Sequence, residues 1–118
     1  MNKLLHTPLT VHNVELANRL VMPPMATGKT PDGTVQDDLL AYYDARSKGG
    51  CIGLIVTEHA YISPEGKAHE GQLSVSRDTD IPGLTKLVET IHKNNTAVIA
   101  QINHAGSAAT EEITGCPA

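Results

Sequence analysis

Polar side chains that could bind a small molecule follow two of the most apolar runs in the chain. Thr57-Glu58-His59 follows IGLIV, and Gln101-Ile102-Asn103-His104 follows AVIA. Glutamine and asparagine amides both donate and accept hydrogen bonds, as does a neutral histidine ring. Such groups need hydrogen-bond partners where they are buried. They indicate either solvated strand ends that cap neighbouring loops or a ligand site, and the residue types favour the ligand site.

A third unusual stretch, NRLVMPPMATG at residues 18–28, begins as an apolar run that Pro23 and Pro24 then interrupt. Because proline cannot donate a hydrogen bond to a neighbouring strand, the pair marks the end of a strand or a bend in it. The residues that follow, up to Thr27, are mostly small. Residues 23–27 are therefore a third candidate strand end.

The strands that would position these stretches are predicted at residues 20–25, 52–56 and 97–102, where the apolar runs lie. The second run is almost continuously apolar, which is typical of a sheet covered on both faces. Before the first strand, short alternating runs in TPLTVHNVELANR, with a turn near His12-Asn13, predict an N-terminal hairpin.

Two helices are predicted between the strands. Residues 36–48 form the first, which ends at Gly49-Gly50. Its apolar face consists of Leu39, Leu40 and Tyr43. Asp80 can cap the second helix, and Asn94-Asn95 ends it. Its apolar residues recur at i, i+3, i+4 and i+7: Leu84, Leu87, Val88 and Ile91.

Strand, helix, strand, helix, strand is the order of an α/β protein with right-handed parallel crossovers. Turn-rich loops are expected at 29–35, 59–76 and 104–118. The sheet could be an open doubly wound sheet or the opening of a (β/α)8 barrel. Eight units of this size would exceed 250 residues, about the usual length of such a barrel, so in the second case we expect these residues to form less than half of it. In both architectures, ligands bind at the C-terminal ends of the strands, where the three polar or proline-rich stretches lie.

Composition excludes several classes of protein. The 118 residues are 40% hydrophobic and 19% charged, which predicts one folded domain rather than disorder. A net charge of −4 and the lack of a Lys/Arg run argue against nucleic-acid binding. No apolar run approaches the roughly 20 residues of a membrane helix, and no signal peptide is recognisable, so we expect a cytoplasmic protein. Cys51 and Cys116 are expected to be free thiols.

Three motifs resemble the N-terminal third of the Old Yellow Enzyme family, the FMN-dependent NAD(P)H:flavin oxidoreductases and 2-enoate-reductase-like proteins. They are TPLTVHNVELANRLVMPPMATG, YYDARSKGGCIGLIVTEHAYISPEGKA and AVIAQINHAG, in the family's order and spacing over nearly the whole chain. The resemblance implies that residues 1–118 are an N-terminal segment of one (β/α)8 barrel domain. The hairpin would close the bottom of this barrel, and FMN would bind noncovalently at its top.

The resemblance also implies cofactor-binding roles. Pro23, Pro24, Met25 and Ala26 match the family's loop that lies against the flavin. His59 matches a position whose main-chain amide faces the isoalloxazine ring. Gln101 matches a glutamine whose amide binds the pyrimidine edge of the flavin. Several relatives carry Cys or Thr at the position of Ala26, and relatives often carry Arg where this chain has Ser107.

The activity implied for the whole protein is hydride transfer from NAD(P)H through the flavin to a small-molecule substrate, an activated alkene. The family's substrate-holding pair and phosphate-binding loops belong to later strands, so no catalytic residue is assigned among these 118 residues. A homo-oligomer is expected. The alternative is a truncated, non-catalytic half-barrel that self-associates or binds a partner to cover its strand edges.

Other interpretations have weaker support. A phosphate-binding (β/α)8 enzyme without flavin stays open as a third option. The sequence has six histidines but no H-E-x-x-H motif and no Cys/His pair at zinc spacing, so we expect no metal site. No G-x-G-x-x-G follows a strand, which argues against a Rossmann dinucleotide site.

Overall fold

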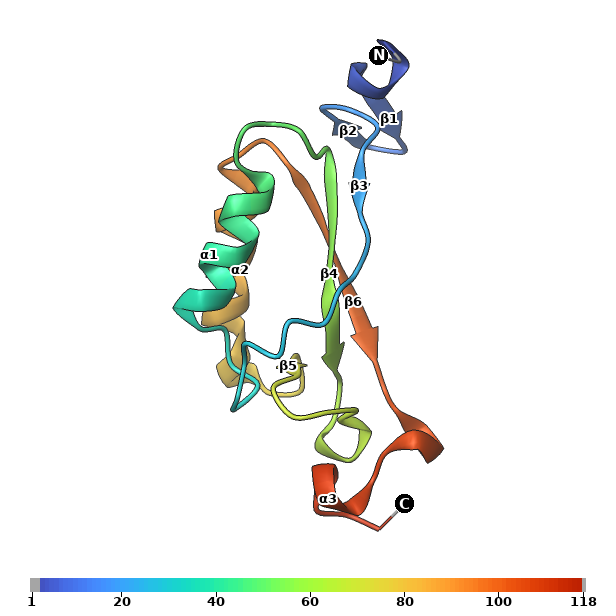
Figure 1. The fold of residues 1–118 in the computed structure, drawn as a ribbon, viewed down its shortest axis with the longest axis vertical. Helices are drawn as coiled ribbons and strands as arrows, with labels where there is room; N and C mark the ends of the chain where they lie inside the picture. The colour runs from blue at the N-terminus through green and yellow to red at the C-terminus, as the bar shows by residue number, and fades with distance from the viewer. Residues whose placement is uncertain (1–2, 118) are drawn as a thin grey trace.

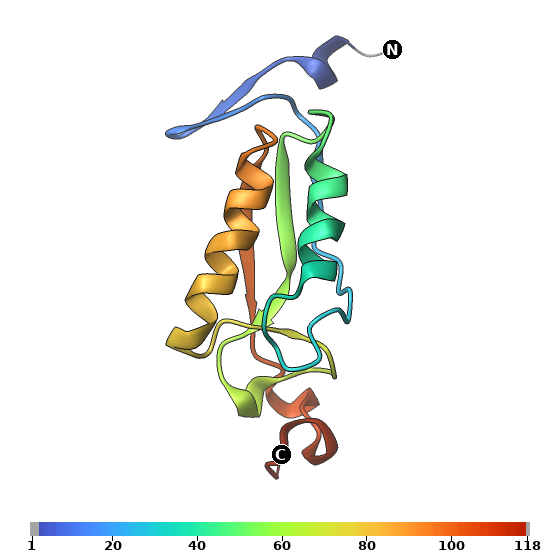
Figure 2. The same cartoon turned by 90° about the vertical axis from the view of Figure 1, so that its left-hand side faces the viewer.

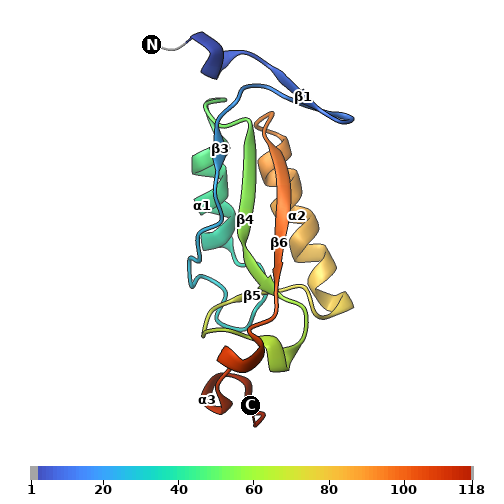
Figure 3. The ribbon, with the colours of Figure 1, turned by 90° about the vertical axis from the view of Figure 1, so that its right-hand side faces the viewer.

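The computed structural model describes residues 3–117, which form a twisted parallel sheet with two α-helices on one face. The helices α1 (Asp37–Ser47) and α2 (Ile81–His92) lie side by side along the sheet (Figure 2). The opposite face of the sheet carries no helix, as Figures 1 and 3 show. This one-sided arrangement is that of part of a (β/α)8 barrel, whose helices surround the strands.

The central strand of the sheet is β4 (Leu54–Tyr61). It pairs in parallel with β3 (Val21–Met22) on one side and with β6 (Ala97–Asn103) on the other. The predicted α/β order with three parallel strands is therefore confirmed. A fourth, two-residue strand, β5 (Leu73–Ser74), pairs with the end of β4 and lies inside the stretch expected to be a loop.

The N-terminal hairpin is present as predicted. Strands β1 (Leu9–Val11) and β2 (Val14–Leu16) are antiparallel, and His12 adopts a positive φ of 52° in the turn between them. A short 3-10 helix, η1 (Lys3–His6), precedes them. The hairpin crosses the N-terminal end of the sheet, the end opposite the candidate site (Figure 3).

The core lies between the helices and the sheet. Leu39 and Tyr43 of α1 are fully buried against Ile55 of β4, and Leu87 and Ile91 of α2 complete the centre of this cluster. The apolar spacing thus placed both helices correctly, and the ends of α1 agree with the prediction to within one residue.

Asp80 occupies the residue before α2, but its carboxylate does not cap this helix. It accepts hydrogen bonds from Ser74 Oγ at 2.6 Å and from the main chain and side chain of Arg77. The expected cap was wrong because Asp80 ends a 3-10 helix, η3 (Asp78–Asp80), whose capping box uses the same carboxylate.

Two predicted boundaries differ from the structure. The first strand was expected over residues 20–25, but β3 ends at Met22, because the two prolines follow it. The region expected as a C-terminal loop contains η4 (Gly106–Ala108) and a one-turn helix, α3 (Glu111–Thr114), while Ala118 lies outside the described residues. In the expected loop after β4, Pro64–Gly66 forms the 3-10 helix η2.

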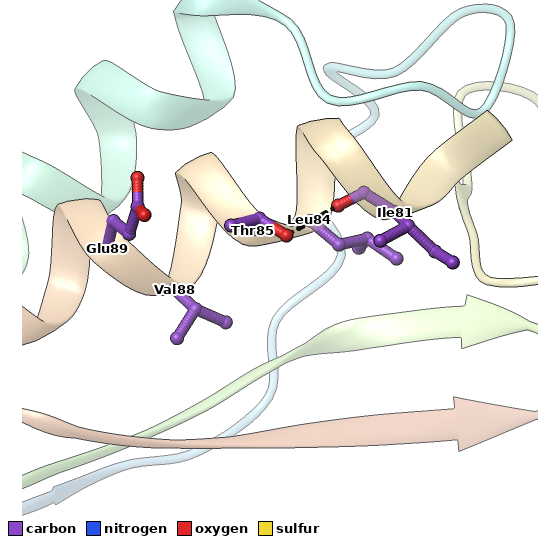
Figure 4. A pocket seen from close by; sticks show the side chains of 5 residues that line it. All are labelled: Ile81, Leu84, Thr85, Val88 and Glu89. Carbon is purple, nitrogen blue, oxygen red and sulfur yellow. Dashed lines mark hydrogen bonds between the residues drawn. The ribbon is translucent and has the colours of Figure 1, made fainter. Parts of the chain in front are cut away.

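Apolar side chains remain exposed on several surfaces, including the sheet and α2. On the bare face of the sheet, Val21 and Ile99 are 51% and 53% exposed. On α2, the exposed Ile81 and Val88 project from the same side of the helix as the half-buried Leu84 (Figure 4). Among residues 3–117, no helix is both long and apolar enough to cross a membrane.

Candidate functional site

The three stretches singled out from the sequence meet at the C-terminal edge of the sheet (Figures 1 and 3). His59 of β4 and Gln101 of β6 are register partners in the parallel ladder. Paired residues of adjacent strands point to the same face, and here it is the bare one, since Ala60 packs in the core on the other face. The loop after β3 reaches the same edge, because Thr27 is hydrogen-bonded to Glu58.

His59 lies within β4 rather than after it, so the prediction that the strand ends at residue 56 was wrong. The ladder continues to the pair Tyr61–Asn103 after a register shift between Val56 and His59. This shift is a β-bulge, in which one strand contains an extra residue. Because of the bulge, His59 rather than Glu58 shares a face with Gln101.

The loop after β3 presents main-chain groups to solvent. Pro23, Met25 and Ala26 are exposed, and Pro24 is half-buried. The N–H groups of Met25 and Ala26 make no hydrogen bond to residues within 3–117. The loop can therefore offer two main-chain donors to a ligand, with little side-chain bulk at Ala26.

Glu58 fixes the far end of this loop. Its side chain is fully buried, and its carboxylate accepts hydrogen bonds from the main-chain N–H of Thr27 at 3.1 Å and from its hydroxyl at 3.0 Å. The main-chain N–H of Glu58 donates to the hydroxyl of Tyr43 at 2.8 Å. Strand β4, helix α1 and the loop are thus joined at one residue.

Burial is the main influence on the ionisation of this cluster. It raises the pKa of the Glu58 carboxyl, and the hydrogen bonds from Thr27 and the charges of His69 and Lys29 partly oppose that rise. Burial likewise raises the pKa of the Tyr43 phenol, which stays neutral and serves as an acceptor.

The loop between η2 and β5 is fastened to the strand ends by a buried amide. Gln72 is fully buried, accepts a hydrogen bond from the N–H of Ala68 at 2.6 Å and donates to Asn103 Oδ1 at 3.1 Å. In the same loop, Nε2 of His69 lies 2.9 Å from Nε2 of His59. This loop therefore forms one side of the candidate site.

Gln101 differs from these residues because its exposed amide makes no hydrogen bond within the described part of the chain. Both its donor and its acceptor are free for a ligand. Together with the main-chain donors of Met25 and Ala26, this donor set fits the polar edge of a flavin ring, which presents carbonyl oxygens and a ring N–H.

Sequence reasoning placed Tyr43 on an apolar helix face and Glu58 among the polar strand-end residues, but it predicted no internal contacts for them. It likewise predicted none of the contacts of Thr27, His69 and Gln72. One signal was available, because a carboxylate in an apolar strand must find hydrogen-bond partners when it is buried. The identity of those partners depends on contacts between residues distant in the sequence.

The fold, with candidate ligand-binding residues at its strand ends, is that of the N-terminal part of a (β/α)8 barrel. Residues 4–117 match the NADH:flavin oxidoreductase / NADH oxidase family, and the chain belongs to that family. The resemblance inferred from the three motifs is thereby confirmed.

Known proteins agree with this assignment. The chain is 40% identical over 106 residues to an NADH oxidase from Thermoanaerobacter brockii, covering 88% of this chain and 16% of that protein. Morphinone reductase in complex with tetrahydroNAD superposes with a TM-score of 0.86 at 28% identity, covering 93% of this chain and 30% of that one. The Old Yellow Enzyme from Pichia sp. AKU4542 gives a TM-score of 0.84 at 31% identity, with coverage of 92% and 28%. The chain thus spans only a minor part of the length of each of these proteins.

Proposed function

We propose that the full-length protein to which this segment belongs is an FMN-dependent oxidoreductase. It would pass hydride from NAD(P)H, through the flavin, to an activated alkene such as an enoate, enone or enoyl thioester. The observation that carries this proposal is the free Gln101 amide, which lies in register with His59 at the C-terminal edge of the sheet. Membership of the NADH:flavin oxidoreductase family supports the choice of cofactor.

Each predicted site residue has a task in this proposal. Pro23 and Pro24 end β3 and stiffen the loop, so that the N–H groups of Met25 and Ala26 face the flavin. Gln101 donates to and accepts from the pyrimidine edge, and His59 offers its main-chain amide. Bound FMN supplies the hydride-transfer chemistry. Because Ala26 has no polar side chain, this chain influences the flavin there through its backbone alone.

No acid, base or nucleophile is assigned among residues 1–118, which we propose to be the N-terminal segment of one FMN-binding barrel domain. The groups that hold the substrate would come from later strands. We further propose a cytoplasmic homo-oligomer that acts on a small molecule.

The test is flavin binding by the full-length protein carrying Gln101→Leu. Loss of two amide hydrogen bonds should weaken FMN binding about 10-fold, because each contributes about 1 kcal/mol or less. Flavin fluorescence gives the dissociation constant, and Gln36→Leu, at a glutamine before α1 that is not among the proposed flavin-binding residues, is the matched control. Unchanged affinity in Gln101→Leu, or a wild-type protein that purifies without colour, would contradict the proposal.

The second candidate, a non-catalytic half-barrel that associates through its bare sheet face, is favoured by the exposure of Val21 and Ile99. Purification of the 118-residue chain alone distinguishes the two functions. A colourless oligomer, detected by light scattering, supports the second candidate, whereas a yellow chain that releases FMN on denaturation supports a working flavin site.

A further inference from the structure

A pair of histidine rings lies at the site, and the proposed function does not use their side chains. Nε2 of His59 is 2.9 Å from Nε2 of His69, and the stacked rings have centroids 5.1 Å apart. His59 belongs to β4 and is in register with Gln101, whereas His69 belongs to the loop between η2 and β5. This loop therefore brings a second imidazole to the strand that faces the ligand.

The second ring nitrogen of His69 determines where the hydrogen atoms lie. Nδ1 of His69 is 2.7 Å from the main-chain oxygen of Glu70. A carbonyl oxygen can only accept, so the hydrogen-bond network assigns a hydrogen to this Nδ1. In neutral His69, Nε2 is then an acceptor, and Nε2 of His59 must donate to it. Neutral His59 is left with an unprotonated Nδ1, which is an acceptor.

One added proton changes a single atom of this pair. Only one hydrogen fits between two nitrogens 2.9 Å apart, and Nδ1 of His69 already carries one. The added hydrogen must therefore lie on Nδ1 of His59, which becomes a donor. A second positive charge is opposed, because burial and the charge of His69 both lower the pKa of His59.

The charged side chains on the elements around the pair are mostly engaged in other contacts. These side chains are Glu58 on β4, Lys29 in the loop after β3, and Lys67 and Glu70 in the loop that carries His69. The Glu58 carboxylate is hydrogen-bonded to Thr27, and Lys67 is paired with Glu70 at 3.2 Å. Strand β6 presents the uncharged amide of Gln101 beside His59.

We propose that His69 is a positioning residue that fixes the tautomer and orientation of the His59 ring. The pair takes up one proton and thereby converts Nδ1 of His59 from an acceptor to a donor toward the bound ligand. This inference rests on the proposed function, because the ligand on this face is then FMN. A charged N–H donor forms a stronger hydrogen bond to a carbonyl oxygen than a neutral one does. FMN binding should therefore tighten as the pair gains its proton.

The experiment combines two variants of the full-length protein, His69→Gln and His69→Ala, with His92→Gln as a matched control at the end of α2. Nitrogen chemical shifts of ¹⁵N-labelled histidine give the ring tautomers, and fluorescence gives the FMN dissociation constant between about pH 5 and 8. In the wild type, His59 should carry its hydrogen on Nε2 at the upper pH, and acidification should tighten FMN binding up to about 10-fold.

The two variants separate positioning from titration. Glutamine can still accept from His59 but cannot take up a proton, so His69→Gln should keep the tautomer and lose the pH dependence. His69→Ala should give a mixture of tautomers and bind FMN about 5-fold more weakly at the upper pH. His92→Gln should match the wild type.

Two results overturn the inference: a hydrogen on Nδ1 of His59 in the neutral wild-type protein, or wild-type tautomers and pH profiles in both His69 variants. Failure of the proposed function gives a different result, because the wild type would then bind no FMN at any pH. That result overturns the ligand part of the inference, and the ring tautomers decide the positioning part without flavin.

Discussion

Glu58 and His59 are adjacent on β4 but belong to polar clusters with opposite properties. The buried Glu58 is satisfied by the chain itself, because Thr27 donates to its carboxylate and Tyr43 accepts from its N–H. On the bare face, Gln101 lies in register with His59, and its amide has no partner within residues 3–117. Satisfaction of the polar groups, rather than polarity itself, thus distinguishes residues that stabilise this edge from residues that can bind a ligand.

The largest effect on stability is expected from a substitution that removes the internal hydrogen bonds of the Glu58 side chain. Glu58→Ala removes both acceptors of Thr27 and leaves a cavity, so it should lower the free energy of unfolding by about 3 kcal/mol. Urea unfolding of the full-length protein measures the change. Glu65→Ala, at an exposed carboxylate of η2, is the control and should change stability by less than about 0.5 kcal/mol. Equal effects of the two substitutions would mean that the Glu58 cluster does not stabilise the fold.

A smaller effect is expected from Tyr43→Phe. This substitution keeps the ring packed in the core and removes only the acceptor of the buried Glu58 N–H, which should cost about 1 to 2 kcal/mol. The same change at Tyr42, whose ring packs edge-on against Tyr43, is the matched control and should cost less than about 0.5 kcal/mol. Thermal unfolding of both variants provides the comparison, and a Tyr43→Phe protein as stable as Tyr42→Phe would contradict the role of the hydroxyl.

The pH dependence of stability provides a third comparison. Because burial raises the pKa of Glu58, the folded protein binds this proton more tightly than the unfolded chain does. Stability should therefore fall as the pH rises from the ordinary carboxyl pKa through the raised value of the folded state, and below that window the loss is absent. Glu58→Gln cannot titrate, so this slope should disappear from its unfolding curve. Identical slopes for the wild type and Glu58→Gln would contradict the raised pKa.

The smallest effect on stability is expected from a substitution on the bare face of the sheet, where Gln101 lies. Gln101→Leu removes an exposed amide without internal partners, so the free energy of unfolding should change by less than about 0.5 kcal/mol in the absence of flavin. Differential scanning calorimetry of the flavin-free protein measures this. A loss of stability comparable to that of Glu58→Ala would place Gln101 among the structural residues and remove the distinction between the clusters.

Much of the fold follows from local sequence. The apolar runs, the helical spacing of Leu84, Leu87 and Ile91, and the proline pair define the order of elements, and the hairpin follows from its turn. The end of β4 could not be predicted in this way. It depends on pairing with β6, which continues the strand through Glu58 and Ala60, residue types that are depleted in strands.

The candidate site, like the fold, could be predicted from the sequence only in part. Gln101 and His59 were selected as candidates because they follow apolar runs and match a family motif. The partners of Glu58 and His59 were not, since Thr27 and His69 are distant in the sequence or lie in an irregular loop. Loop conformation determines these contacts, and no short motif encodes it.

The bulge before His59 has a consequence for protein engineering. It shifts the phase of the strand by one residue, so that inward-facing positions on β4 are even-numbered before it, at Leu54 and Val56, and odd-numbered after it, at His59. A mutant library designed on uninterrupted alternation would randomise Glu58 in place of His59. Deletion of Thr57 or Glu58 would instead remove the bulge, because a single residue would then lie between Val56 and His59, opposite Ala100. A one-codon deletion could thereby straighten the strand and leave the imidazole in register with Gln101.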